Sequence, residues 1–254
     1  MSDSHRHDNP LMHPTPSKTE HRAKPKTVAI SQSNYIPWKG YFDLINSVDE
    51  FVLFDDMQYT RRDWRNRNRI KTPQGPQWLS ISVQTKGKYS QRICETEISD
   101  PSWSERHWKT LRHCYSKAPH FQEYERVFRD LYLNCRETLL SRINHRFLTA
   151  ICRMLGIRTT ISWSMDFKII EGKTERLVEI CRTAGATTYL TGPAARTYID
   201  LSMFQRAGIT LAFFDYSGYP EYYQMHPPFV HEVSIVDLIF NEGAAAKNYM
   251  KTFS

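Results

Sequence analysis

The sequence predicts an α/β fold built on a mostly parallel sheet. Strand signals alternate with helical signals at both ends of the chain, and Phe51–Phe54 is a continuous apolar run of the kind found in strands covered on both faces. Gly185 and Gly208 each follow a predicted helix and precede a predicted strand, where a left-handed cap favours glycine.

The first elements form a βαβ unit. Residues 1–26 are polar, contain four of the ten histidines and lack apolar periodicity, so we expect a disordered tail and no fixed metal geometry. Thr27–Ser31 reads as a buried strand, and an amphipathic helix is predicted for Lys39–Val48. The strand Phe51–Phe54 follows at once, which implies a right-handed crossover.

A β-hairpin and a helical block are predicted next. Residues 64–71 and 77–83 alternate in character across a Pro-rich turn, which places Arg65, Arg67 and Arg69 on one face and Asn66 and Asn68 on the other. Helical spacing follows in three segments: 103–117, 120–136 and 138–155, with Gly156 as a stop.

The α/β alternation then returns. Strands are predicted at 159–163, 187–190 and 209–214, and helices at 174–184 and 201–207. We therefore expect one domain over 27–254, with Rossmann-like or HUP-like layering and an insert at about 61–156 between the second and third strands.

Charge and composition narrow the classes of function. The net charge is +7, and the eleven residues from Arg61 to Lys71 hold six cations and one acid, a patch that favours phosphate or another anion. The five cysteines have no disulfide or zinc spacing. No apolar run reaches the roughly 18 residues of a membrane span, and no secretory signal is present. A cytoplasmic protein without a membrane partner is expected.

Ligands of open α/β sheets bind at the carboxyl ends of the strands, near a switch in strand order. The predicted strand ends here are rich in polar and aromatic side chains. The candidate ligand contacts are Gln32, Asn34, Tyr35, Trp38, Gln58, Tyr59, Thr191, Gly192 and Tyr198. The last three lead from a strand into a helix whose free amides could hold an anion. Aromatic residues such as Tyr35 and Trp38 could equally belong to the core.

Three residues are candidate acids or bases. Asp55 and Asp56 are adjacent, so one of them faces a cleft at most, and we assign Asp56 as the general base. Its alternative role is an ion pair with Arg61 or Arg62. Asp215, at another strand end, and His226, in a Pro-rich loop, are further candidates, and a structural role is the alternative for His226. We expect Asn34, Tyr35, Asp56, Gln58 and Asp215 to face one pocket.

The hairpin could recognise a polyanion. Arg62 and Arg67 can form bidentate bonds to phosphate, whereas Asn66 and Asn68 can read amides, hydroxyls or base edges. A nucleotide diphosphate fits this pattern, and so does RNA stacked on Trp64 and Tyr59. The alternative is a surface hairpin that pairs internally with acids such as Glu95 and Glu97.

Four ordered segments together resemble the WbqC-like proteins, and the match extends over nearly everything after the tail. They are SQSNYIPWKGYFDLI, FDDMQYTRRDWRNRNRIK, YLTGPAARTYI and VSIVDLIFNEG. Members of this family occur in bacterial O-antigen and related polysaccharide gene clusters, and glycine transfer onto a sugar has been suggested for them. The resemblance therefore implies a bacterial enzyme of glycan or natural-product biosynthesis.

Three functions are open at this stage. The first is a transferase that moves an aminoacyl or acyl group, such as glycyl, onto an amino or hydroxy group of a nucleotide-linked sugar or another phosphorylated small molecule. The sequence has no Walker loop, GxGxxG fingerprint or zinc spacing, and no bound cofactor is expected. The donor of such a transferase would therefore be activated before it binds, for instance as an aminoacyl-tRNA. The second is an ATP-dependent ligase or nucleotidyltransferase, because the first strand, loop and helix are similar in layout to those of HUP-class proteins, although the paired His of that class are absent. The third is a noncatalytic module that binds nucleic acid or nucleotide sugars.

Overall fold

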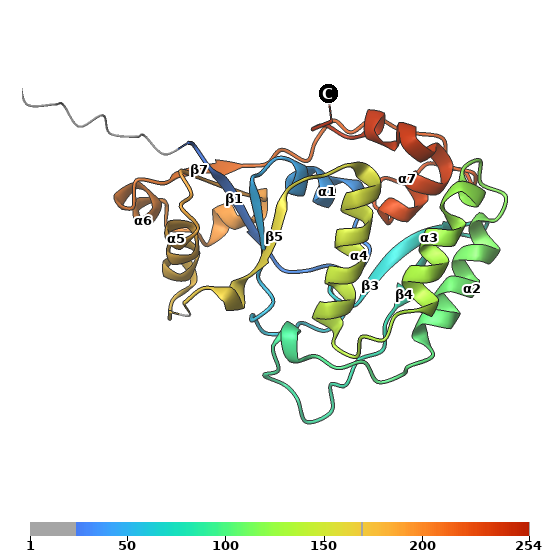
Figure 1. Cartoon of the computed structure of the whole chain (residues 1–254), viewed down its shortest axis with the longest axis horizontal. Helices are drawn as coiled ribbons and strands as arrows, with labels where there is room; N and C mark the ends of the chain where they lie inside the picture. The colour runs from blue at the N-terminus through green and yellow to red at the C-terminus, as the bar shows by residue number, and fades with distance from the viewer. Residues whose placement is uncertain (1–23, 169, 254) are drawn as a thin grey trace, which may run out of the picture.

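The computed structural model describes residues 24–168 and 170–253 (Figure 1). Most of the predicted tail, residues 1–23, lies outside the described residues. Lys26, however, already belongs to the domain: its Nζ donates to the Glu50 carboxylate at 2.7 Å, and its carbonyl accepts from the amide of Thr187 at 2.8 Å. Lys26, the last residue assigned to the predicted tail, therefore has contacts with the domain.

The predicted parallel sheet is confirmed. Five strands lie in the order β5-β2-β1-β6-β7, and every neighbouring pair is parallel. Their bounds are Thr27–Ser31 for β1, Glu50–Leu53 for β2, Thr160–Trp163 for β5, Thr188–Thr191 for β6 and Thr210–Phe213 for β7. From β1 the chain adds β2 and β5 on one side of the sheet and then returns to add β6 and β7 on the other. The strand order therefore reverses between β1 and β6.

Helices cover both faces of this sheet. Helices α5 (Lys173–Thr183) and α6 (Leu201–Arg206) lie on one side, and α1 (Lys39–Asn46) and α4 (Leu140–Leu155) lie on the other (Figure 1). Val52 packs in the cluster beneath α5 and α6, whereas its neighbours Phe51 and Leu53 pack in the cluster that contains α1 and α4. The continuous apolar run of the second strand is explained by burial on both faces.

The predicted insert is present between β2 and β5. Its elements are β3 (Arg67–Thr72), β4 (Gly75–Ser80), the 3-10 helix η1 (Ile93–Glu95), α2 (Trp103–Tyr115), α3 (Phe121–Leu133) and α4. Gly156 ends α4 with φ +69°, the left-handed cap that its position predicts. Ile81, Trp103 and Phe147 of the insert share one apolar cluster with Phe51 of the sheet. The insert and the sheet therefore have a common core.

The C-terminal segment holds a helix that the sequence did not indicate by its periodicity. Helix α7 (Ile235–Glu242) is followed by the 3-10 helix η4 (Gly243–Tyr249), and two shorter 3-10 helices, η2 (Ser164–Asp166) and η3 (Pro193–Thr197), follow β5 and β6. All residues of α7 up to Asn241 are buried. The helix has only eight residues, most of them apolar, and a run of that length resembles a buried strand as much as a helix.

Candidate functional site

A cavity of about 840 Å³ opens at the carboxyl ends of β1 and β6, where the strand order reverses. Ser31 and Gln32 line it from β1, and Thr191 and Gly192 line it from β6. Parallel sheets place their ligands at this reversal because the connections diverge to opposite faces and leave a crevice between them. The size lies within the range of small-molecule sites.

The wall of this cavity is basic. Arg65, Lys173 and Arg176 contribute cations, and Glu171 is the one acid among the residues that line it. Helix α5 begins here, after Gly172, which has φ +92° and provides no side-chain cap for the first helical amides. The positive end of a helix and three cations together favour an anionic ligand.

Arg176 is held in place by Asp56. The two side chains form an ion pair in which 14% of the arginine side chain and 1% of the aspartate side chain are exposed. The Ser164 hydroxyl donates to the other carboxylate oxygen of Asp56. Asp56 does not line the cavity but lies behind Arg176. The sequence offered an ion pair with Arg61 or Arg62 as the alternative role of Asp56. Asp56 does form an ion pair, but its partner is Arg176.

Asp55 is fully buried and has different partners from its neighbour. It accepts hydrogen bonds from the amide of Ser33 and the hydroxyl of Ser141, both at 2.7 Å. Burial raises the pKa of this carboxyl above its usual value, and these two hydrogen bonds oppose the rise. Asp55 therefore ties the loop after β1 to α4, while Asp56 supports the cavity wall.

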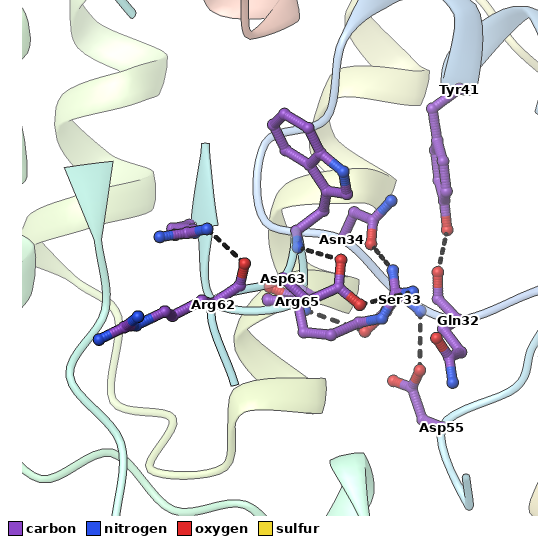
Figure 2. A network of polar contacts seen from close by, with 11 residues as sticks. Gln32, Ser33, Asn34, Tyr41, Asp55, Arg62, Asp63 and Arg65 are labelled. Carbon is purple, nitrogen blue, oxygen red and sulfur yellow. Dashed lines mark hydrogen bonds and ion pairs between the residues drawn. The ribbon is translucent and has the colours of Figure 1, made fainter. Parts of the chain in front are cut away.

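Arg65 reaches this loop from the insert (Figure 2). Its guanidinium donates to Asn34 Oδ1 and lies 3.4 Å from the carboxylate of Asp63. The side chain is 15% exposed and lines the cavity. Its Nε is buried and has no hydrogen-bond partner within residues 24–168 and 170–253. Arg65 thus brings a positioned cation to the sheet edge.

Four of the predicted ligand contacts do line the cavity: Gln32, Thr191, Gly192 and Tyr198. The segment after Gly192 is not the anion-binding helix that was expected. It is the five-residue 3-10 helix η3, and its first residue, Pro193, has no amide hydrogen. Tyr216, which follows β7, also lines the cavity, and burial raises the pKa of its phenol to about 12. Its hydroxyl therefore stays protonated at neutral pH.

The prediction that Asn34, Tyr35, Asp56, Gln58 and Asp215 face one pocket is wrong. None of the five lines the large cavity, although Asn34 contacts Arg65, which does. Tyr35 is fully buried, and its hydroxyl bonds to Tyr132 at 2.8 Å and to His107 at 2.9 Å. The loop after β1 turns back into the insert, so its aromatic side chain enters the core.

Other predicted side chains stand away from the cavity. Gln58 is exposed and donates to the carbonyl of Tyr89 at 3.0 Å, and Tyr59 is 7% exposed within the core. Asp215 is exposed; the backbone amide of Ser217 lowers the pKa of its carboxyl, and Lys251 lies 3.3 Å away. These residues follow strands, but the chain turns outward or into the insert after them.

His226 lies on the insert side of the molecule. Its Nε2 is 3.2 Å from the carbonyl of Cys114 in α2, and His226 does not line the large cavity. The structural role that was its alternative agrees with this contact.

The hairpin uses most of its polar side chains within the protein. Arg67 donates to the carbonyl of Arg62 and stacks on Trp78 at 4.2 Å, while Arg69 pairs with Glu232. Both arginines contact Trp78 and so share a face, but Arg65, predicted to lie on that face too, precedes β3 and lines the large cavity instead. The acids that pair with the hairpin arginines are Asp63 and Glu232 rather than the expected Glu95 and Glu97, which pair with Arg92 and Lys88.

The two asparagines and the last lysine of the hairpin have internal partners as well. Asn66 donates to the carbonyl of Ile81, and Asn68 donates to the carbonyls of Tyr35 and Ile36. Lys71 is 1% exposed and donates to the carbonyl of Pro228. The predicted polyanion surface is thus reduced, because these groups join the hairpin to the loops around it.

The sequence interpretation missed the segment that follows the third strand of the sheet. Glu171, Lys173 and Arg176 lie at or near the start of α5 and line the cavity. The signal was present as EGKTER before a predicted helix. It was overlooked because the long insert hides the fact that this strand lies beside β2.

Within the part of the chain that the structure describes, no group of three or more His, Cys, Asp or Glu side chains could hold a metal ion. None of the described helices has the length and apolar character needed to span a membrane.

Comparison with known proteins gives one family and one relative. The model of the WbqC-like protein family matches residues 32–249. The chain is 51% identical over 226 residues to the uncharacterized protein Rv1507c of Mycobacterium tuberculosis, an alignment that covers 89% of this chain and 98% of the relative. No solved structure matches the chain.

Proposed function

The chain belongs to the WbqC-like family, and we propose that it is a group transferase whose nucleotide-linked substrate binds in the cavity between the ends of β1 and β6. The single observation that supports the proposal most is the meeting of three cations and the start of α5 at this crevice. Phosphates bind well at such a place because arginine and free helix amides both donate to their oxygens.

The side chains of the cavity wall can be given separate roles in binding and catalysis. Arg65, Lys173 and Arg176 bind and orient the phosphates. Glu171 replaces Asp56 as the proposed general base, because it is a carboxylate on the cavity wall whereas Asp56 is already paired with Arg176. Asp56 is then a positioning residue.

In the transfer step, an amine or hydroxyl of the substrate attacks the carbonyl carbon of an activated acyl or aminoacyl ester. The attacking group loses its proton to Glu171 as the new bond forms. The carrier leaves with the electron pair of the broken C–O bond and takes up a proton as its hydroxyl. An aminoacyl-tRNA is one donor of this class.

Binding can be tested with two variants that remove the same charge. Lys173→Gln alters the cavity wall, and Lys117→Gln alters an exposed lysine that does not line it. We expect Lys173→Gln to weaken binding of nucleoside diphosphates and nucleotide sugars by about tenfold in calorimetric titration, and Lys117→Gln to leave it unchanged. Equal affinities in the two variants would contradict the proposal.

An ATP-dependent ligase or nucleotidyltransferase is the second candidate, and the strand order favours it. A sheet that reverses beside β1, with a crevice at that point, is a common nucleotide-binding arrangement. ATP should then raise the melting temperature more than ADP and nucleotide sugars do, and pyrophosphate or ADP should form on turnover. Saturable binding without turnover on any donor would instead support a noncatalytic module.

A further inference from the structure

A second, smaller cavity of about 200 Å³ lies between the loop after β1 and the hairpin. Its walls consist of two tryptophans, two asparagines, one proline and one glutamate. These residues are Asn34, Pro37, Trp38, Trp64, Asn68 and Glu232. The volume suits one ring rather than a whole nucleotide.

Two contacts join the walls of the two cavities. Arg65 of the large cavity donates to Asn34 of the small one, and the two lie side by side in Figure 2. Tyr216 of the large cavity packs on Trp38 of the small one with ring centroids 5.6 Å apart. One layer of side chains therefore separates the cavities, and a single ligand could extend across it.

The small cavity has a different chemistry from the large one. None of the six side chains is a cation. Trp38 and Trp64 offer apolar ring faces. Glu232 offers the carboxylate oxygen that does not face Arg69, and the bond from Arg65 to Asn34 Oδ1 leaves the Nδ2 of that amide as a donor. Asn68 is already bonded to backbone carbonyls. Such walls suit an uncharged ring with one apolar face and several hydroxyls, which describes a pyranose.

We propose that the small cavity binds the sugar ring of the substrate whose nucleotide occupies the large cavity. This assignment rests on the proposed function. Arg65 stands between the two cavities and would contact the phosphates that connect nucleotide and sugar.

The test compares matched ligand pairs on the full chain: UDP with UDP-glucose, dTDP with dTDP-glucose, and GDP with GDP-mannose. For at least one pair we expect the hexose to tighten binding by about tenfold in calorimetric titration. Trp64→Ala and Glu232→Gln should each reduce that gain several-fold while leaving the affinity for the nucleoside diphosphate unchanged. Trp64 is 40% exposed and the Glu232 side chain 70% exposed, so both variants should fold.

Two controls separate this inference from the proposed function. Lys173→Gln should weaken both members of a pair equally, and Tyr223→Ala, which removes an exposed aromatic ring outside both cavities, should change neither. A nucleoside diphosphate that binds without any gain from the hexose, or a gain that survives both small-cavity variants, overturns the sugar assignment alone. A failure of every pair to bind overturns both proposals.

Discussion

The crevice at the sheet edge and the hairpin of the insert are both rich in arginine, yet they use it differently. In the hairpin, Arg67 and Arg69 stack on Trp78 and bond to a carbonyl and a carboxylate of the same chain. In the crevice, Lys173, Arg176 and Arg65 line an open cavity. The density of cations along a sequence therefore does not identify an anion site. What matters is whether the folded chain places those cations on the wall of a cavity.

The largest effect should come from the ion pair that supports the crevice. Asp56→Ala leaves Arg176 without its partner in a nearly buried position, and we expect the free energy of unfolding to fall by about 3 kcal/mol. Glu97→Ala is the matched control, since it breaks the exposed Lys88–Glu97 pair and should cost less than about 1 kcal/mol. Urea unfolding measures both. Similar losses would show that the Asp56 pair is no different from a surface pair.

The second effect is a dependence of stability on pH, which we expect from the buried side chain of His107 in the insert. Burial lowers the pKa of His107, which contacts the Ser80 carbonyl and the Tyr35 hydroxyl, to about 4. This pKa lies below the unfolded-state value of roughly 6.5, so the unfolded chain binds the proton first as the pH falls. The free energy of unfolding is therefore at its full value above that pH and decreases by about 3 kcal/mol as the pH falls towards 4.

Unfolding measured from pH 7 to pH 4 tests this expectation. His107→Gln should flatten the profile, whereas His113→Gln, at an exposed position of the same helix, should keep the slope of the wild type. An equally steep profile in His107→Gln would exclude His107 as the titrating group.

The third prediction concerns Arg65, which links the hairpin side to the crevice. Arg65→Gln removes a cation from the cavity wall and should weaken binding of a nucleoside diphosphate by about tenfold. Calorimetric titration at fixed ionic strength measures the change. Unaltered affinity would place Arg65 with the structural arginines of the hairpin and remove the proposed connection between the cavities.

The smallest effect is expected for the substitution of Arg67, two residues after Arg65. Arg67→Gln removes the same charge but loses an internal hydrogen bond and a cation–π contact, so we expect about 1 kcal/mol of lost stability and no change in ligand affinity. Thermal unfolding and the same titration check both parts. Weaker binding in this variant would restore the hairpin as an anion-binding surface.

The order and type of most elements could be predicted from the sequence because they depend on local patterns. The second strand is a continuous apolar run, and Gly156 provides the left-handed end of α4. Helix α7 was not predicted, since a mostly apolar run of eight residues is too short for its periodicity to distinguish a helix from a strand. The large cavity lies at the strand-order switch, where the α/β alternation led us to expect a ligand.

Which side chains meet at that switch was decided by tertiary structure. The sequence placed Asp56 at a strand end, but only the packing of α5 against β2 pairs it with Arg176, 120 residues later in the chain. The same holds for Arg65, which the insert returns to the loop after β1. Sequence patterns report a residue's preference for helix, strand or burial. The direction of a side chain after a strand ends depends on long-range contacts, which no local pattern contains.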